Sequence, residues 1–257
     1  MAMTESLGKT LHQLQRRFGP GYGRRGWPDG RNEVIPTGAI SLDIALGGGI
    51  PRGRVTQIFG PPGVGKTTLA LHVAGEARRL GLTAAWIVAE DPPPAWYAGR
   101  CGVDPLEILT FHPLTLEQAL ETVEALARTG EVGLVVVDSV AGLAPRCEVE
   151  GEHGDAHPKV MERRWDQAFR KIGPVLRRSK TALVLVNQVR VDPGVLFGNP
   201  ERRVAWEVLD YWSSIILDLR RTEAIREGRG QAVLPVSYTH LRAHETRHDL
   251  VCRLLLE

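Results

Sequence analysis

The stretch Gly60-Pro61-Pro62-Gly63-Val64-Gly65-Lys66-Thr67 decides the fold class of this chain. It fits the phosphate-loop pattern G-x-x-x-x-G-K-[ST], in which glycines let successive N–H groups point at phosphate oxygens and a helix N-terminus adds positive charge. Residues 54–59 are predicted as a short buried strand before it, and residues 67–80 as a helix after it. A lysine-capped Gly/Pro turn would share these letters, but the order of strand, loop and helix predicts a nucleoside triphosphate site.

Each polar residue of this loop has a predicted task. Lys66 reaches the β- and γ-phosphates, and the Thr67 hydroxyl binds Mg²⁺. The predicted nucleotide-binding residues of the loop and the helix start are Gly60, Pro61, Pro62, Gly63, Val64, Gly65, Lys66, Thr67 and Thr68.

Composition indicates a soluble globular protein, with 257 residues, 43% hydrophobic and 24% charged. The net charge is only +2, so a nucleic-acid site has to come from local basic patches. The sequence shows neither an apolar run long enough for a membrane span nor a signal-peptide pattern, so we expect a cytoplasmic protein without a membrane partner. Cys101, Cys147 and Cys252 stand in no metal-ligand spacing and are expected to be reduced thiols.

The chain is predicted to have three parts. Residues 1–32 form an amphipathic helix (4–18) and a Gly/Arg-rich linker, and the helix packs either on its own core or on a neighbour. Residues 33–235 alternate apolar strands and helices, which indicates an α/β fold with a mostly parallel sheet flanked by helices. Its candidate strands are 54–59, 84–89, 108–111, 134–138, 181–187 and 214–219, and a helix over 116–128 begins with the capping-box pair Thr115 and Gln118.

Two acids follow predicted strands. Asp138 ends an apolar strand, the pattern that places a carboxylate near phosphate-bound Mg²⁺, and Glu90 ends another strand. Carboxyl ends of parallel strands face the ligand crevice, so both acids and the phosphate loop should converge there. Glu90 would then orient and deprotonate a water for attack on the γ-phosphate. An acid at a strand end can also be a plain cap or turn residue.

A third strand ends in Asn187-Gln188 rather than in an acid. An amide at this place can hydrogen-bond the γ-phosphate and report its presence to the loop that follows, residues 189–206. That loop combines glycines with arginines, which suits phosphate contacts along a nucleic-acid strand, although a solvated surface loop has the same composition.

With these residues in hand, the chain resembles the bacterial RecA recombinases over residues 7–228. The specific stretches are Ile35-Pro-Thr-Gly-Ala-Ile-Ser-Leu-Asp-Ile-Ala-Leu46, Val137-Asp-Ser-Val140, Glu148-Val-Glu-Gly-Glu-His-Gly-Asp155, Asn187-Gln-Val-Arg190 and Gly194-Val-Leu-Phe-Gly-Asn-Pro-Glu201. The resemblance implies a RecA-like ATPase core that uses ATP and Mg²⁺ to assemble a helical filament on single-stranded DNA. It also implies strand exchange with double-stranded DNA, a role in DNA repair and the SOS response, and stimulated self-cleavage of a LexA-type repressor.

The resemblance also carries residue roles onto matching positions. By this resemblance the catalytic residues would be Glu90, Lys66 and Gln188, with Gln188 as the sensor that links the γ-phosphate to DNA affinity. Thr67 and Asp138 would be the Mg²⁺ residues, Asp138 acting through water, and Tyr97 would stack on the base. Residues 148–158 resemble the first DNA-binding loop. The second supplies Arg190, Gly194, Phe197, Gly198, Asn199, Arg202 and Arg203. The N-terminal helix would dock on a neighbouring protomer.

The sequence departs from the family in three places. Asp91-Pro92-Pro93-Pro94 replaces the usual acid of the adenine-contacting segment. Residues 202–206 read Arg-Arg-Val-Ala-Trp where family members carry threonines and a glycine pair. The resemblance ends near residues 231–235, and residues 236–257 resemble a non-native tail in which we expect no strand. Three histidines, His240, His244 and His248, could line one helix face there as metal ligands.

The leading interpretation is therefore a DNA-dependent ATPase of the RecA type, a single-stranded-DNA-binding recombinase. The alternative is a non-catalytic RecA-fold paralogue that regulates or binds DNA, which the altered adenine segment and second loop favour. A RadA-like repair protein or a circadian-clock ATPase fits less well, because no four-cysteine zinc module precedes the core.

Overall fold

A computed structural model describes residues 5–19, 23, 33–151, 158–191, 201–221, 225–227, 231–233 and 236–243 of the chain. The chain divides into two compact units, Met1–Asn32 and Glu33–Glu257. The first unit holds helix α1 (Glu5–Phe18), which agrees with the helix predicted over residues 4–18. Its last turn carries Arg16 and Arg17, whose charges favour the C-terminal end of the helix dipole.

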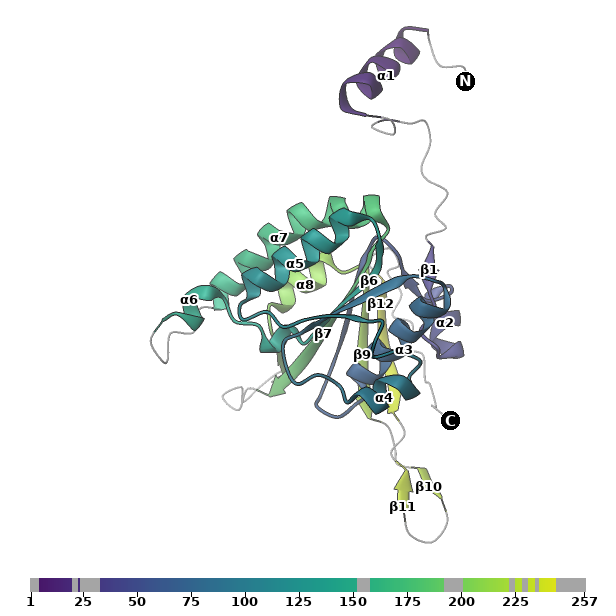
Figure 1. Cartoon of the computed structure of the whole chain (residues 1–257), viewed down its shortest axis with the longest axis vertical. Helices are drawn as coiled ribbons and strands as arrows, with labels where there is room; N and C mark the ends of the chain where they lie inside the picture. Colours follow the sequence, from purple (N-terminus) through teal and green to yellow (C-terminus); the bar gives the residue numbers. More distant parts are fainter. Residues whose placement is uncertain are drawn as a thin grey trace. The chain divides into compact units, whose positions relative to one another are not determined.

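The second unit is built on a central sheet with the strand order β12-β9-β3-β7-β6-β4-β5 (Figure 1). The neighbouring strands from β9 to β5 run parallel, whereas β12 is antiparallel to β9. The strands are β3 (Val55–Gly60), β4 (Thr83–Val88), β5 (Leu109–Phe111), β6 (Val132–Asp138), β7 (Ala182–Val191), β9 (Ile215–Arg221) and β12 (Val236–Ala243). The predicted fold class is confirmed.

Shorter strands complete the unit. Strand β8 (Glu201–Arg203) pairs antiparallel with the end of β7. Two further antiparallel pairs are formed by β1 (Val34–Ile35) with β2 (Ile50–Pro51) and by β10 (Ile225–Glu227) with β11 (Gln231–Val233).

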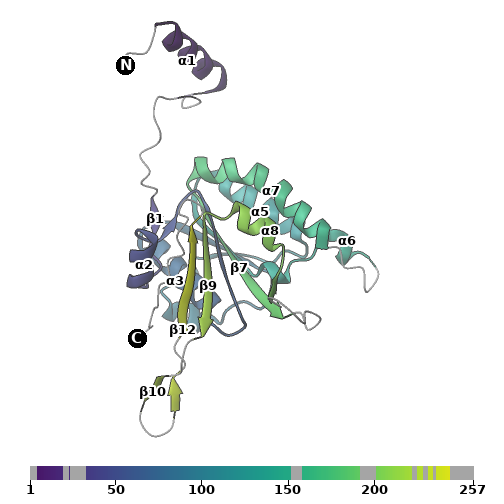
Figure 2. The ribbon, with the colours of Figure 1, turned by 180° about the vertical axis from the view of Figure 1, so that it is seen from behind.

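Helices cover both faces of the sheet, and Figure 2 shows the same layers from behind. One face carries α2 (Ile40–Leu46), α3 (Lys66–Arg79) and α4 (Ala95–Arg100), and the other carries α5 (Leu116–Thr129), α7 (Pro158–Ser179) and α8 (Trp206–Trp212). The short helix α6 (Arg146–Val149) and the 3₁₀ turn η1 (Val140–Gly142) lie between β6 and α7 in the chain. Among the described residues, none of the helices combines the length and apolarity needed to cross a bilayer.

The two faces explain why the strands are apolar throughout. In β6, Leu134 and Val136 belong to the core under α3, while Val135 and Val137 belong to the core under α5 and α7. Successive side chains of a strand point to opposite faces, so a strand covered on both sides needs apolar residues at every position.

Local signals set the helix ends as the sequence indicates. Thr115 is the N-cap of α5, and its hydroxyl accepts a hydrogen bond from the Gln118 N–H at 3.3 Å. The Gln118 side chain accepts from the Leu114 N–H at 2.8 Å rather than from Thr115, so only half of the predicted capping box forms. Gly130 ends the helix in the left-handed conformation.

The expectation of no strand after residue 235 is wrong, because β12 pairs with β9 from Val236↔Arg221 to Ala243↔Ile215. The physical reason is that β9 would otherwise leave the backbone groups of an edge strand unpaired. Residues 236–243 also include Val, Tyr and Thr, which suit a strand. His240 lies in this strand, whereas His244 and His248 lie outside the described residues, so a helical histidine face does not form here.

Candidate nucleotide and DNA site

The phosphate loop joins the end of β3 to the start of α3 and depends on two glycines. A Cβ on Gly60 would lie 2.3 Å from the Leu219 carbonyl oxygen, so the backbones of β3 and β9 approach too closely for any side chain. Gly65 has φ 88° and is the N-cap of α3, a conformation that favours glycine. The first N–H groups of a helix lack intrahelical partners, so this turn offers backbone donors to an anion.

Lys66, the first residue of α3, lies inside the loop. Its ammonium donates to the Pro61 carbonyl at 2.8 Å, and the residue is only 8% exposed. Burial lowers the pKa of Lys66, an effect that the nearby carboxylates of Asp138 and Glu90 oppose. A buried cation in a ring of N–H donors is stabilised by a polyanion, as phosphate binding requires.

Thr67 and Asp138 bring a hydroxyl and a carboxylate together. The Thr67 hydroxyl donates to Asp138 Oδ2 at 2.9 Å, which connects the start of α3 to the end of β6. Burial raises the pKa of Asp138 most strongly. The Thr67 hydrogen bond lowers it, Glu90 raises it, and Lys66 lowers it. A hydroxyl next to a carboxylate at the edge of a phosphate site is a donor set that suits Mg²⁺, so these residues fit the predicted metal.

Glu90 connects three strands at the same edge of the sheet. It follows β4, and its Oε1 accepts hydrogen bonds from the Ser139 hydroxyl, after β6, and from Gln188 Nε2 on β7 at 2.7 Å. Gln188 is also the register partner of Gly60, the last residue of β3. The structure therefore places the predicted water-activating acid and the predicted γ-phosphate sensor in direct contact, beside the phosphate loop.

Three residues at this edge were given no role of their own from the sequence, although Asn187 was named with Gln188 as an amide at the strand end. Ser139 is 1% exposed and holds Glu90. Asn187 is buried, and its side chain donates to the Val204 carbonyl at 2.9 Å. Arg221, at the end of β9, approaches the Gly63 carbonyl at 3.3 Å. Ser139 and Asn187 each neighbour a predicted residue in the chain, a signal that could have found them, whereas the approach of Arg221 depends on the strand order.

Tyr97 and Thr68 lie together beyond the loop. The Tyr97 hydroxyl on α4 and the Thr68 hydroxyl on α3 are 2.7 Å apart and hydrogen-bonded. Trp96 packs edge-on against the Tyr97 ring, with 5.6 Å between centroids, and is 67% exposed. An aromatic pair therefore lies beside α3, the helix that begins at the phosphate loop. The stacking of Tyr97 on a base stays a prediction.

In the predicted second DNA loop, the described arginines at the two ends differ in how exposed their side chains are. Gly194, Phe197, Gly198 and Asn199 lie outside the described residues. Arg190 and Arg202 are register partners across β7 and β8, and both are exposed. Arg203, also predicted to bind DNA, is held instead by Asp210 in a two-bond ion pair at 2.9 and 2.8 Å. The side chain of Arg203 is only 17% exposed and is neutralised by that partner, and its contact with DNA stays a prediction.

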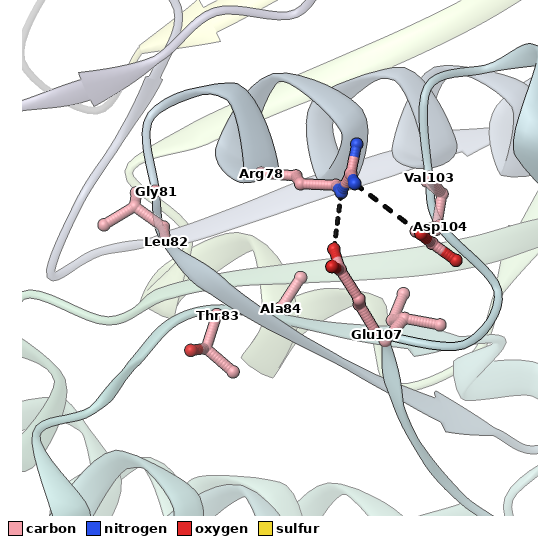
Figure 3. A pocket seen from close by; sticks show the side chains of 9 residues that line it. Arg78, Gly81, Leu82, Thr83, Ala84, Val103, Asp104 and Glu107 are labelled. Atoms are coloured by element: carbon pink, nitrogen blue, oxygen red, sulfur yellow. Dashed lines mark hydrogen bonds and ion pairs between the residues drawn. The ribbon is translucent and has the colours of Figure 1, made fainter.

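A cavity of about 300 Å³ lies elsewhere on the unit (Figure 3). It is lined by residues 81–84 at the amino end of β4 and by Arg78, which pairs with Glu107 at 2.7 Å and with Asp104 at 3.5 Å. Ligands of open α/β sheets bind outside the carboxyl ends of the strands, whereas this cavity lies at the amino end of β4. We therefore place the functional site at the phosphate loop.

Comparison with known proteins identifies the family of this chain. The family described as "RecA N-terminal domain" matches residues 5–238. The chain belongs to the RecA family. The resemblance drawn from the sequence is thereby confirmed.

Relatives and a solved structure agree with this assignment. Protein RecA of Herpetosiphon aurantiacus is 46% identical over 228 residues, which are 88% of this chain and 63% of that protein. Protein RecA of Thermus aquaticus is 48% identical over 221 residues, 85% of this chain and 65% of that protein. The crystal structure of the RadB recombinase superposes with a TM-score of 0.60 at 25% identity, covering 84% of this chain and 92% of that one. The chain thus spans less than two thirds of the length of these RecA relatives.

Proposed function

We propose that this RecA-family chain is an ATP-dependent, single-stranded-DNA-binding recombinase with DNA-dependent ATPase activity. The observation that carries the proposal is the hydrogen-bonded contact between Glu90 and Gln188 beside the phosphate loop. Glu90 is the acid suited to hydrolysis, and Gln188 is the amide at the start of the predicted DNA loop. Through their hydrogen bond, bound nucleotide can change DNA affinity, and bound DNA can change the rate of hydrolysis.

ATP would be held by the loop 60–65, by Lys66 and by the first turn of α3, with Tyr97 on the side of the base. Thr67 and Asp138 would hold Mg²⁺, the latter through water. Bound Mg²⁺ supplies charge neutralisation at the β- and γ-phosphate oxygens. Lys66 adds a fixed positive charge at the same place, and burial strengthens its effect because little water screens it.

Hydrolysis would depend on how Glu90 is held. Its carboxylate accepts a water proton and orients that water towards the γ-phosphate, while Ser139 and Gln188 keep the carboxylate at one position. Gln188 would exchange part of its bond to Glu90 for a γ-phosphate oxygen, which connects hydrolysis to the strand that leads to Arg190.

DNA binding would use the outward pair Arg190 and Arg202. Two like charges opposite one another on neighbouring strands repel, so an anion between them relieves a cost already present in the hairpin. DNA phosphates supply such anions at regular spacing. Binding of single- and double-stranded DNA, a helical homo-oligomer, a LexA-type repressor as partner, roles in DNA repair and the SOS response, and a cytoplasmic location belong to the same proposal.

A non-catalytic RecA-fold paralogue is the second candidate. It is favoured by the segment Asp91-Pro92-Pro93-Pro94 and by the inward position of Arg203, both departures from the family pattern. The intact contact between Glu90 and Gln188 favours the catalytic assignment, because a protein that only binds nucleotide has no need of a held acid at this place.

The proposal is tested by the anisotropy of a fluorescent single-stranded oligonucleotide, titrated with the chain in the presence and absence of Mg-ATP. We expect tighter binding with ATP, and loss of that difference in Lys66→Ala. The matched control is Lys180→Ala, which removes an exposed lysine paired with Glu33 at the opposite edge of the sheet. DNA affinity that is equal with and without ATP, or that is unchanged in Lys66→Ala, would contradict the proposed function.

A further inference from the structure

The first and last residues of strand β8 both form ion pairs. Side chains alternate along a strand, so Glu201 and Arg203 share one face of β8 and Arg202 points to the other. Glu201 accepts two hydrogen bonds from Arg220 on β9, one of them 2.6 Å long. Hydrogen bonding to Arg220 lowers the pKa of Glu201. The face opposite Arg202 is thus turned towards the sheet.

Arg203 contacts both helix α8 and strand β3. Its guanidinium forms a two-bond ion pair with Asp210 on α8, and its Nη1 donates to Gln57 Oε1 on β3 at 3.2 Å. The guanidinium carbon also lies 3.9 Å from the centroid of the Phe59 ring. Such planar, forked and stacked geometry is specific to arginine, and lysine cannot reproduce it.

The partners of Arg203 adjoin the nucleotide site. Phe59 immediately precedes Gly60, where the phosphate loop begins, and Val189, the register partner of Arg203, immediately follows Gln188. Phe59, Val189 and Ile216 form a small buried cluster under the guanidinium. Arg203 therefore lies over the two strands that present the phosphate loop and the γ-phosphate sensor.

The next residue is fixed as well. Val204 accepts the hydrogen bond from the buried Asn187 side chain at 2.9 Å, so the chain that leaves β8 is tied to β7 a second time. The hydrogen bond of Val204 and the ion pair of Arg203 thus fix two successive residues to their surroundings.

We propose that Arg203 is a positioning residue. Held by Asp210 over Phe59, it fixes β8 to the strand that enters the phosphate loop and so keeps Arg190 and Arg202 facing DNA without itself touching the DNA. The DNA part of this inference rests on the proposed function. The ion pair itself does not depend on it.

The salt dependence of DNA affinity separates a positioning role from a phosphate contact. Each phosphate contact with single-stranded DNA adds about 0.7 to the slope of log affinity against log salt concentration. Arg202→Gln should therefore weaken binding and flatten the slope by about that amount. Arg203→Gln should weaken binding about tenfold, from the loss of hydrogen bonds between charged groups, and leave the slope unchanged.

The direction in which Asp210→Asn changes DNA affinity decides between a positioning role and a DNA contact for Arg203. We expect it to weaken DNA binding as Arg203→Gln does, although it removes a negative charge, because Arg203 loses its anchor. If Arg203 contacted DNA, freeing it from Asp210 would strengthen binding or leave it unchanged, and that result would overturn the proposal. A flattened slope in Arg203→Gln, or unchanged affinity in that variant, would overturn it as well. Arg178→Gln, an exposed arginine in the last turn of α7, controls for the loss of one surface charge.

A stability measurement without DNA keeps the two proposals distinguishable. Urea unfolding of Arg203→Gln, Asp210→Asn and the double variant forms a double-mutant cycle. We expect the double variant to be less destabilised than the sum of the single variants, and strict additivity would overturn the positioning role. If the unmodified chain binds no DNA, the proposed function fails, and the cycle still decides whether Arg203 holds β8.

Discussion

Replacing Ser139 by alanine tests how the hydrolytic acid is held. Ser139 is 1% exposed, and its hydroxyl is one of two groups that donate to Glu90 Oε1, the other being Gln188 Nε2 at 2.7 Å. A hydrogen bond to a charged acceptor contributes about 1.5–3 kcal/mol. If that holding is needed in the transition state, its loss lowers kcat about ten- to hundredfold, since each 1.36 kcal/mol is tenfold in rate.

The assay is steady-state ATP hydrolysis with saturating single-stranded DNA, together with the Kd of a fluorescent ATP analogue. We expect kcat to fall and nucleotide affinity to stay within about twofold, because Ser139 holds the acid and not the phosphates. Ser213→Ala is the matched control, since Ser213 is equally buried and donates to the Leu209 carbonyl at the far edge of the sheet. If Ser139→Ala keeps full kcat, or if Ser213→Ala loses as much, the reasoning is refuted.

Three further predictions concern stability and the position of the site. Burial raises the pKa of Asp138 above its ordinary value of about 4. Between these two pKa values the folded chain keeps a proton on Asp138 that the unfolded chain has released. The free energy of unfolding should therefore fall, relative to that of Asp138→Asn, as the pH rises from about 4 through the raised pKa. Urea midpoints of both proteins across that range check this, and parallel curves would speak against it. A Cβ on Gly142 would lie 2.4 Å from the Ala89 carbonyl oxygen and 3.0 Å from Glu90 Cγ, so Gly142→Ala should lower both the melting temperature and kcat, and unchanged hydrolysis would contradict the geometry. Thr115→Ala removes the N-cap hydroxyl of α5 and should cost about 1 kcal/mol in urea unfolding without changing kcat; a loss of kcat would show that α5 reaches the site.

Much of the fold was predictable because it is encoded locally. Six predicted strands fall on β3, β4, β5, β6, β7 and β9, mostly with ends within two residues, because a strand buried on both faces is an unbroken apolar run. Asp138 and Glu90 were predictable because each follows such a run. Parallel strands bring their carboxyl ends to one edge, so their convergence follows from the fold class alone.

The remainder depends on long-range pairing that local patterns do not contain. The composition of residues 202–206 indicated DNA contacts for both arginines, but the register of β8 turns Arg203 inward, towards an acid on a later helix. The signal was present in principle, since Glu201 and Arg203 share a face in any strand, although their partners could not be named. Likewise β12 forms because an unpaired edge of β9 is available to it, a property of the sheet and not of the segment.

ATP hydrolysis by the full chain, measured with and without single-stranded DNA, tests the central claim most directly. We predict strong stimulation by DNA, and in Glu90→Gln retained nucleotide binding without turnover, because the amide cannot accept the proton of the attacking water. A chain that binds ATP but shows no hydrolysis in either condition would contradict the account and favour the non-catalytic paralogue. Full turnover in Glu90→Gln would remove Glu90 from the mechanism.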